Sequence, residues 1–371
     1  MSKTIWKVGW GFTTKCNMNC AFCYSRIHRK NADDIREDKK LEFCKKFIDK
    51  NHHLISDINY GTSENALSEK WFEFFEYVYN HHKEIRQGIT TNGTFGKVLQ
   101  ENGKIRDWAI DALNDVDVSL DFFDPKLHNK FRGKKNAYEF AIKTLELCRE
   151  NGIEKSIVML ATPETFTKSN VEGLFQIASE FDANLRVNIY EPVMEQPFYM
   201  FNKFRISYDQ FITTLKHILM NHKVIKLNDP LFSSIFGLKH SKGDCTGHKS
   251  LRILPNGNLT PSTYLITPEW FAGNIYQNPN IDLSTIKNSE SFQKLLNSPL
   301  PKGCKKCDFK GSCLGGVYVR RILWYNTLNE KDPYCPFRHP NGFKFDFDIN
   351  VKEKNKKLVH EDYLPTLIFS P

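Results

Sequence analysis

The feature that most constrains the fold is an alternation of two hydrophobic periods along the first two-thirds of the chain. Apolar runs of strand length are separated by helical patterns of ten or more residues. The predicted strands are Trp6–Phe12, Ile55–Tyr60, Gln87–Thr91, Val116–Leu120, Ile157–Ala161 and Leu185–Tyr190. The predicted helices are Leu41–Lys50, Ser68–His82, Ile105–Leu113, Ala137–Asn151 and Asn170–Phe181, with Ser68 and Asn170 as N-caps and Gly152 as a C-cap. Repeated units of this kind predict an α/β fold with a parallel sheet, closed or partly closed, and functional loops at the carboxyl ends of its strands.

A group of three cysteines follows the first predicted strand. Cys16, Cys20 and Cys23 have the spacing C-x3-C-x2-C. Three thiolates on one short loop can hold three irons of a [4Fe–4S] cluster and leave the fourth iron open to a substrate or cofactor. A zinc site normally takes four ligands, commonly as two pairs. His28 is the nearby candidate for a fourth ligand, but its basic neighbours indicate a solvated loop, so the triplet favours a cluster.

A second group of cysteines lies near the C-terminus. Cys304, Cys307 and Cys313 have the spacing C-x2-C-x5-C, and Cys335 follows in Pro-Tyr-Cys-Pro. Four thiolates can close a structural zinc site or a fully ligated [4Fe–4S] cluster, and spacing alone does not choose between them.

Composition limits the class of protein. The 371 residues suffice for one large barrel and a smaller module, and they include no apolar run long enough to span a bilayer. The N-terminus leaves no room for a signal peptide, so the ten cysteines indicate metal ligands in a reducing cytoplasm rather than disulfides. The net charge of +9 is spread over many lysines and indicates a solvated surface. We therefore expect neither a membrane nor a nucleic acid as partner.

The N-terminal triplet, with Phe22 and Tyr24 beside Cys23, resembles the signature of radical S-adenosylmethionine (SAM) enzymes. The resemblance implies a partial (β/α)6 TIM-type barrel. It also implies that SAM chelates the open iron and is cleaved to a 5′-deoxyadenosyl radical, which takes hydrogen from the substrate. Cys16, Cys20 and Cys23 would then be both cluster ligands and catalytic residues.

The resemblance also suggests SAM or substrate contacts at the strand ends. Gly61, Thr62, Ser63 and Glu64 stand where the family has Gly-Gly-Glu-Pro, although the same stretch suits a turn before a helix. Thr91 and Asn92 match a Thr-Asn-Gly at the barrel mouth, which is equally a plausible turn. Ser119 and Asp121 match Ser-x-Asp, and Arg186 and Asn188 share the inner face of the sixth strand. Charged side chains inside a barrel need a ligand or a partner.

The C-terminal cysteines resemble the SPASM/twitch-type module of radical SAM peptide maturases. Cys304, Cys307, Cys313 and Cys335 match the ligands of its outer auxiliary cluster. Cys245 matches the first position of the pattern, but Ser262 and Val317 replace two cysteines of the inner cluster. The resemblance thus implies one auxiliary [4Fe–4S] cluster. Thr263 stands where sulfatase maturases carry Asp, which argues against sulfatase maturation.

The expected organisation is a radical SAM barrel over residues 1–195, a bridging helical segment over 196–240 with a helix at Ser207–Asn221, a SPASM/twitch-like module over 241–340 and a tail over 341–371. The tail is a candidate for covering the barrel or holding a peptide.

The expected function is modification of a ribosomal precursor peptide by cross-linking, oxidation or backbone excision. The expected partners are that peptide, an electron donor such as flavodoxin or ferredoxin, and a separate small leader-binding protein. One alternative is a radical SAM enzyme for a sugar, nucleotide or cofactor precursor. Another is a non-catalytic iron–sulfur or zinc scaffold, against which the triplet argues.

Overall fold

The structure, a computed structural model, describes residues 5–30, 35–193, 198–238, 243–339, 347–353 and 357–371. Its strands are β1 (Trp6–Trp10), β2 (Ile55–Tyr60), β3 (Arg86–Thr91), β4 (Asp115–Ser119), β5 (Glu154–Ala161), β6 (Asn184–Ile189), β7 (Lys223–Leu227), β8 (Ser250–Ile253), β9 (Leu259–Thr260) and β10 (Leu367–Ser370). Its helices are α1 (Arg26–Lys30), α2 (Glu37–Asn51), α3 (Glu69–His81), α4 (Thr94–Glu101), α5 (Gly103–Ala112), α6 (Pro125–Arg132), α7 (Ala137–Glu150), α8 (Lys168–Glu180), α9 (Phe198–Phe204), α10 (Tyr208–Asn221), α11 (Pro230–Ile235), α12 (Glu290–Leu296) and α13 (Tyr318–Tyr325). No helix in these described ranges is long and apolar enough to cross a lipid bilayer.

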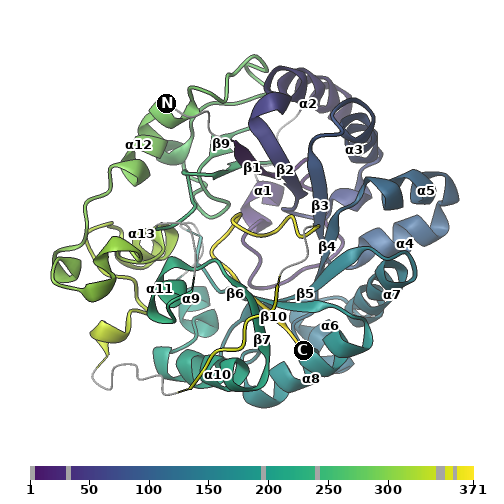
Figure 1. Ribbon diagram of the computed structural model, residues 1–371. Helices are drawn as coiled ribbons and strands as arrows, with labels where there is room; N and C mark the ends of the chain where they lie inside the picture. Colours follow the sequence, from purple (N-terminus) through teal and green to yellow (C-terminus); the bar gives the residue numbers. More distant parts are fainter. Residues whose placement is uncertain (1–4, 31–34, 194–197, 239–242, 340–346, 354–356) are drawn as a thin grey trace.

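Six parallel strands form the centre of the molecule. Strands β1 to β6 pair in chain order, each with the next. Helices α2 to α8 surround them on the outside (Figure 1). The sheet stays open, because β8 and β9 extend it beyond β1 while β10 and β7 extend it beyond β6. The prediction of a partial (β/α)6 barrel is confirmed.

Helix α3 shows how the sequence specifies the outer layer. The Ser68 side chain accepts a hydrogen bond from the Trp71 amide at 3.2 Å, as its predicted N-cap role requires. Trp71, Phe74, Phe75 and Val78 recur every three or four residues, and all are fully buried. The apolar stripe thus fixes which face of α3 packs on the sheet.

Two short helices, α4 and α6, were not predicted, because eight residues give too little periodicity to detect. Helix α6 nevertheless carries clear boundary signals. The Asp124 side chain accepts from the Leu127 amide at 2.8 Å, Pro125 occupies the first turn, and Gly133 ends the helix at a φ of 64°.

The predicted N-cap of α8 was wrong. Thr167 caps this helix, because its hydroxyl accepts from the Asn170 amide at 3.4 Å. The Asn170 side chain instead donates to the carbonyl oxygens of Asp121 and Thr165, at 2.8 and 2.7 Å. Asn170 therefore ties α8 to the loop that follows β4.

The C-terminal third continues the barrel sheet. Strands β8 and β9 form a hairpin, with Gly257 at a φ of 83° in its Asn-Gly turn. Strand β8 pairs in parallel with β1, so the hairpin begins at the barrel edge. The predicted helix at Ser207–Asn221 is α10, and the strand β7 that follows it was not predicted.

The tail runs inside the barrel before it joins the sheet. Strand β10 pairs antiparallel with both β6 and β7. Upstream, His360 is fully buried, with its Nδ1 2.9 Å from Asp115 Oδ1 and its Nε2 3.3 Å from Thr90 Oγ1. Figure 1 shows this yellow segment crossing the space enclosed by the strands. The tail thus fills the barrel beneath the strand ends.

Candidate active site

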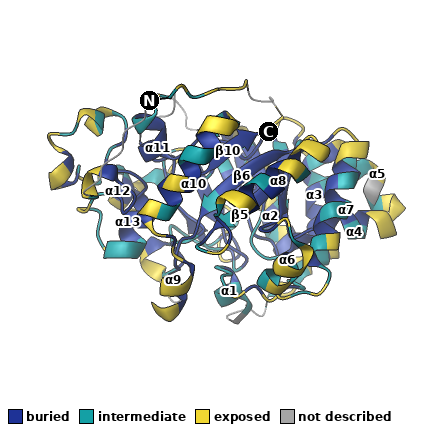
Figure 2. Cartoon of the chain, turned by 90° about the horizontal axis from the view of Figure 1, so that it is seen from below, coloured by how far each residue is buried: buried dark blue, intermediate teal, exposed yellow. Residues whose placement is uncertain are grey.

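A cavity of about 950 Å³, open solvent included, lies at the carboxyl ends of the parallel strands. Helices α1, α6 and α9 follow β1, β4 and β6 in the chain, and all three lie at the same end of the molecule (Figure 2). The cavity is lined by all three cysteines of the N-terminal triplet. It is also lined by the predicted residues Phe22, Tyr24, Thr62, Ser63, Thr91, Asn92, Ser119 and Asn188. Four other predicted residues, Gly61, Glu64, Asp121 and Arg186, do not line it.

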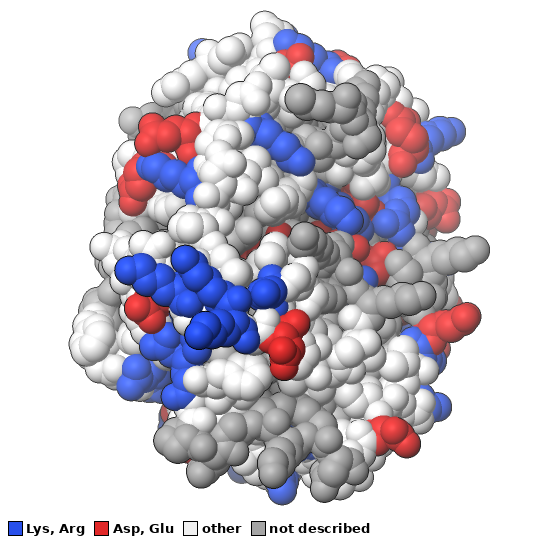
Figure 3. Space-filling view, turned by 60° about the vertical axis from the view of Figure 1, so that its left-hand side comes forward, with Lys and Arg blue, Asp and Glu red and all other residues white. Residues whose placement is uncertain are grey.

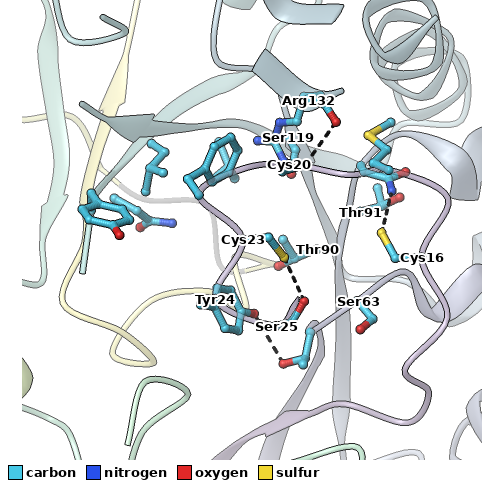
Figure 4. A pocket seen from close by; sticks show the side chains of 18 of the residues that line it. Cys16, Cys20, Cys23, Tyr24, Ser25, Ser63, Thr90, Thr91, Ser119 and Arg132 are labelled. Carbon is cyan, nitrogen blue, oxygen red and sulfur yellow. Dashed lines mark hydrogen bonds between the residues drawn. The ribbon is translucent and has the colours of Figure 1, made fainter. Parts of the chain in front are cut away.

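The triplet lies on the loop between β1 and α1, and each thiol has a polar neighbour (Figure 4). These neighbours are Asn92 Nδ2, 3.7 Å from Cys16 Sγ, Arg132 O, 3.4 Å from Cys20 Sγ, and Ser25 Oγ, 3.1 Å from Cys23 Sγ. Burial raises the pKa of Cys16, and it raises the pKa of Cys20 to about 11. These thiols therefore need a cationic partner to become thiolates.

The spacing of the thiols fits a cluster better than a single metal ion. Neither cysteine group forms a disulfide. A zinc ion with four sulfur ligands at about 2.3 Å holds the sulfurs about 3.8 Å apart. Among the described residues, no three cysteine thiols lie within 4.8 Å of one another. A [4Fe–4S] cluster suits wider spacing, because each thiolate binds a different iron.

His28 differs from the sequence prediction. It is buried rather than solvated, with 7% of its surface exposed. Burial lowers its pKa to about 4, so the ring is neutral near pH 7.

The turn after β2 holds strained backbone at the cavity edge. Thr62 and Ser63 adopt φ angles of 70° and 62°, a left-handed conformation that non-glycine residues rarely take. Tyr24 Oη lies 3.4 Å from Thr62 Oγ1, across the gap between the cysteine loop and this turn. Strain of this kind persists where the surroundings hold it, which is common at ligand sites.

Glu64 joins the loops behind the cavity. Its carboxylate accepts from the Thr91 hydroxyl at 2.9 and 3.0 Å and from the Asn92 amide at 2.8 Å. Burial raises its pKa to about 7, although these hydrogen bonds act to lower it. Glu64 therefore positions Thr91 and Asn92, and Asn92 in turn contacts Cys16. A direct contact between Glu64 and SAM stays a prediction.

Asp121 likewise acts through a neighbour. Its carboxylate is fully buried and accepts from Arg132 Nε at 2.6 Å and from the Leu160 amide at 2.9 Å. Arg132 lines the cavity and lies over the ring of Phe22, 5.2 Å from its centroid. Asp121 thus places a guanidinium at the cavity wall.

Arg186 lies deeper in the barrel. It pairs with Asp117 at 2.6 Å and donates from Nε to Thr366 Oγ1 at 3.1 Å. The Thr366 hydroxyl donates to Asn188 Oδ1 at 2.8 Å, and Asn188 lines the cavity. Asp117 on β4 and Thr366 in the tail therefore supply the partners that the buried guanidinium of Arg186 requires.

Sequence reasoning missed several lining residues. Arg132, Glu191 and Tyr264 line the cavity but were not assigned to the site, because no local motif marks them. Glu191 lines this cavity and a smaller adjoining one, and its buried Oε2 has no hydrogen-bond partner among the described residues. Burial raises the pKa of Glu191 well above its ordinary range, although Arg320 acts to lower it. Glu191 therefore faces the cavity with a carboxyl group shifted toward its protonated form.

The C-terminal cysteines converge on a separate, smaller cavity of about 350 Å³. Cys304, Cys307, Cys313 and Cys335 all line it, together with apolar side chains that include Leu231 and Phe309. Burial raises the pKa of Cys335 to about 11. We refer to these four residues as the cysteine quartet. Cys245 does not line this cavity; it is buried, and Asn228 Nδ2 lies 3.8 Å from its Sγ.

Basic side chains gather around the quartet. Lys302, Lys305, Lys306, Lys310 and Arg338 are exposed there, and Lys310 also lines the small cavity. Figure 3 shows a broad basic area on this face of the molecule. Phe337 adds an aromatic ring, 59% exposed. The positive charge is thus concentrated here more than the sequence indicated.

Comparison with known proteins supports the geometry. The family description "Radical SAM superfamily" matches residues 10–176. The AdoMet-dependent heme synthase of Methanosarcina barkeri is 23% identical over 358 residues, which are 89% of this chain and 96% of that protein. The subtilosin biosynthesis protein AlbA of Bacillus subtilis is 24% identical over 326 residues, which are 84% of this chain and 66% of that protein.

Two solved structures share the fold. Native anSMEcpe with bound AdoMet superposes with a TM-score of 0.67 at 19% identity, over 89% of this chain and 94% of that one. SuiB from Streptococcus suis, bound to its precursor peptide SuiA, gives a TM-score of 0.65 at 15% identity, over 90% of this chain and 76% of that one. Residues 10–176 therefore form a radical SAM domain, so the protein is a radical SAM enzyme, and its fold resembles that of SPASM-type maturases.

Proposed function

We propose that the protein is a peptide maturase that modifies an unactivated carbon of a ribosomally made precursor. The observation that carries this proposal is the lack of anion-binding groups in the cavity. Among the described lining residues Arg132 is the one Lys or Arg, and Asp121 already pairs with it. A phosphorylated nucleotide or a porphyrin carboxylate would need more cations than this wall offers. A peptide backbone and apolar side chains need none.

The rim of the cavity supports a peptide as well. Phe204 and Met200 of α9 pack with Tyr190 and with Phe22 of the cysteine loop. On the same helix, Phe198 and Tyr199 are 73% and 68% exposed. Exposed aromatic side chains next to a cavity are typical of binding surfaces for peptides. AlbA is named for biosynthesis of a bacteriocin, and SuiB was solved with a precursor peptide.

The triplet would hold a [4Fe–4S] cluster that, with SAM bound beside it, supplies a radical able to abstract hydrogen. The described side chains would bind and orient the ligands. Tyr24, Thr62 and Ser63 would contact SAM at the open side of the cysteine loop, and Asn188 would close the floor. Glu191 would form a hydrogen bond with the substrate, since its buried Oε2 lines the cavity and has no partner among the described residues.

The quartet would hold one auxiliary cluster, and the basic area around it would receive an acidic electron carrier such as a flavodoxin or ferredoxin. Opposite charges steer such encounters, and an exposed aromatic ring beside the site adds apolar contact. A separate small protein would present the leader of the precursor. Clusters held by thiolates need a reducing compartment, so we expect the protein in the cytoplasm.

The alternative is a radical SAM enzyme for a small molecule, as the name of the heme synthase suggests for that relative. Few cations in the cavity favour the peptide.

The test offers three substrates to the reconstituted protein with SAM and dithionite: a display library of ribosomally made peptides, GTP and iron coproporphyrin. We expect a mass change in peptides that requires SAM and disappears in the Cys16→Ala variant. Turnover of GTP or the porphyrin, without peptide modification, would overturn the proposal.

A further inference from the structure

A cluster of metal-ligand side chains lies at the opposite end of the strands from the cavity. His52, His82 and Glu84 come from three segments: the end of α2, the end of α3 and the residues just before β3. They therefore lie at the amino ends of β2 and β3, whereas Thr62, Ser63 and Thr91 line the cavity at the carboxyl ends. None of the three lines a described cavity of the active site. The cluster is separate from the radical site.

The donor atoms are close enough to share one ion. One ligand atom from each of His52, His82 and Glu84 lies within 4.8 Å of the other two. His52 Nδ1 is 2.5 Å from Glu84 Oε1, and the two imidazole rings lie 4.8 Å apart at 30° to each other. Two imidazoles and a carboxylate form a common donor set for zinc, with ligand distances of about 2.0 to 2.2 Å. A tetrahedral zinc ion holds its nitrogen and oxygen ligands about 3.3 Å apart, so His52 Nδ1 and Glu84 Oε1 would separate by about 0.8 Å to admit the ion.

A second layer of contacts fixes the buried member of the set. His82 is 7% exposed, and its Nε2 lies 2.9 Å from Asp49 Oδ1. The Tyr77 hydroxyl donates to the same carboxylate at 2.8 and 3.1 Å. A carboxylate that holds a histidine ring, itself held by another group, is typical of metal sites. Asp49 also stands close enough to His82 to add negative charge beside an ion.

The electrostatic surroundings also favour a cation. His52 is the C-cap of α2 and His82 is the C-cap of α3, so the carbonyl ends of both helices converge here. Each helix C-terminus carries partial negative charge.

We propose that His52, His82 and Glu84 form a zinc site that ties α2 to α3 at the base of the barrel. Water takes the fourth position, since Glu84 and His52 are partly open to solvent. Simple ion pairs would explain each contact alone. They do not explain why two imidazoles and a carboxylate from three separate segments bring their donor atoms within 4.8 Å of one another at two helix C-termini. A divalent ion bound by all three would explain it.

Isothermal titration calorimetry with ZnCl2 tests the proposal on the fully reconstituted, tag-free protein under anaerobic conditions. We expect one zinc per chain. The Glu84→Gln and His82→Gln variants should weaken binding more than about 100-fold, and Asp49→Asn about 10-fold, the usual effect of losing a carboxylate behind a metal ligand. His53→Ala and His81→Ala are matched controls, because both residues are exposed neighbours outside the set. The controls should bind zinc as the wild type does.

Zinc-edge X-ray absorption identifies the ligands independently of any loss of folding. The proposal is supported if the zinc has nitrogen and oxygen neighbours at about 2.0 Å and no sulfur neighbour. Sulfur neighbours at about 2.3 Å would show that the zinc is bound by cysteines and would overturn the proposal. Thermal unfolding supplies a third readout: zinc should raise the midpoint of the wild type and the controls by about 3 °C and leave Glu84→Gln unchanged. Equal zinc affinity in wild type and Glu84→Gln would also refute the proposal.

Discussion

The two cysteine sites of this molecule differ in what surrounds them. The triplet faces a cavity of about 950 Å³ with hydroxyl, amide and guanidinium groups on its wall, whereas the quartet encloses about 350 Å³ among mainly apolar side chains. Three ligands at the larger cavity leave one position of a cluster free for a bound molecule, whereas four ligands at the smaller one can complete the coordination of a cluster. This difference supports the proposal that the chemistry takes place at the triplet and electron transfer at the quartet, and the four predictions below test it.

The largest effect should come from removing one site at a time. Replacing Cys16, Cys20 and Cys23 by Ala should abolish SAM cleavage, while Cys304→Ala/Cys307→Ala should leave SAM bound. Each variant should lower the iron content from about eight to about four per chain. Iron analysis and Mössbauer spectra measure this, with Cys148→Ala, a buried helix cysteine, as the control. About four irons per chain in the wild type, with zinc at the quartet, would show that the quartet holds no cluster and would refute the proposed contrast.

A substitution in the tail should affect the cavity of the triplet and leave the quartet unchanged. Thr366→Val removes the hydroxyl that joins Arg186 to Asn188 and leaves a buried guanidinium N–H without its acceptor. Such a loss costs about 2 kcal/mol of unfolding free energy. Urea unfolding should show this loss, and SAM affinity should fall while the spectrum of the quartet's cluster stays constant. Thr327→Val, which lies outside the barrel, is the control.

Reversing two charges beside the quartet tests whether an electron carrier docks there. Lys305→Glu/Lys306→Glu should weaken binding of an acidic flavodoxin about 10-fold at low salt, because long-range attraction is lost. The difference should vanish at high salt, since counterions screen exposed charges. Lys39→Glu/Lys104→Glu, at two exposed positions on α2 and α5, is a matched control. Unchanged flavodoxin affinity in the double variant would show that flavodoxin binds at another surface.

The smallest effect concerns the strained turn at the triplet's cavity. Thr62→Gly should raise the free energy of unfolding by about 1 kcal/mol, because glycine adopts a φ of 70° without steric cost. SAM affinity should fall at the same time, as the turn loses its contact with Tyr24. Thr327→Gly, at a position without positive φ, should destabilise instead.

The sequence allowed prediction of what depends on local pattern. The six parallel strands, α3 with its Ser68 cap and both cysteine groups are each encoded within a few residues, so they were found. Thr167 displaced Asn170 as the cap of α8 because Asn170 serves a tertiary contact to Asp121. The hydrogen bond of Arg186 could not be predicted either, because its partner Thr366 lies 180 residues away in the sequence. Glu191 was missed for the same reason: only the fold reveals that its carboxyl lacks a partner.

The position of β10 has a consequence for how the molecule is made. A ribosome delivers β6 and β7 long before Leu367–Ser370, so both strands must wait with open edges until those residues emerge. During that interval nothing from residues 357–370 fills the barrel. Pairing across such a long stretch of chain is slow. The cysteine loop is thus synthesised long before the residues that fill the barrel beneath it.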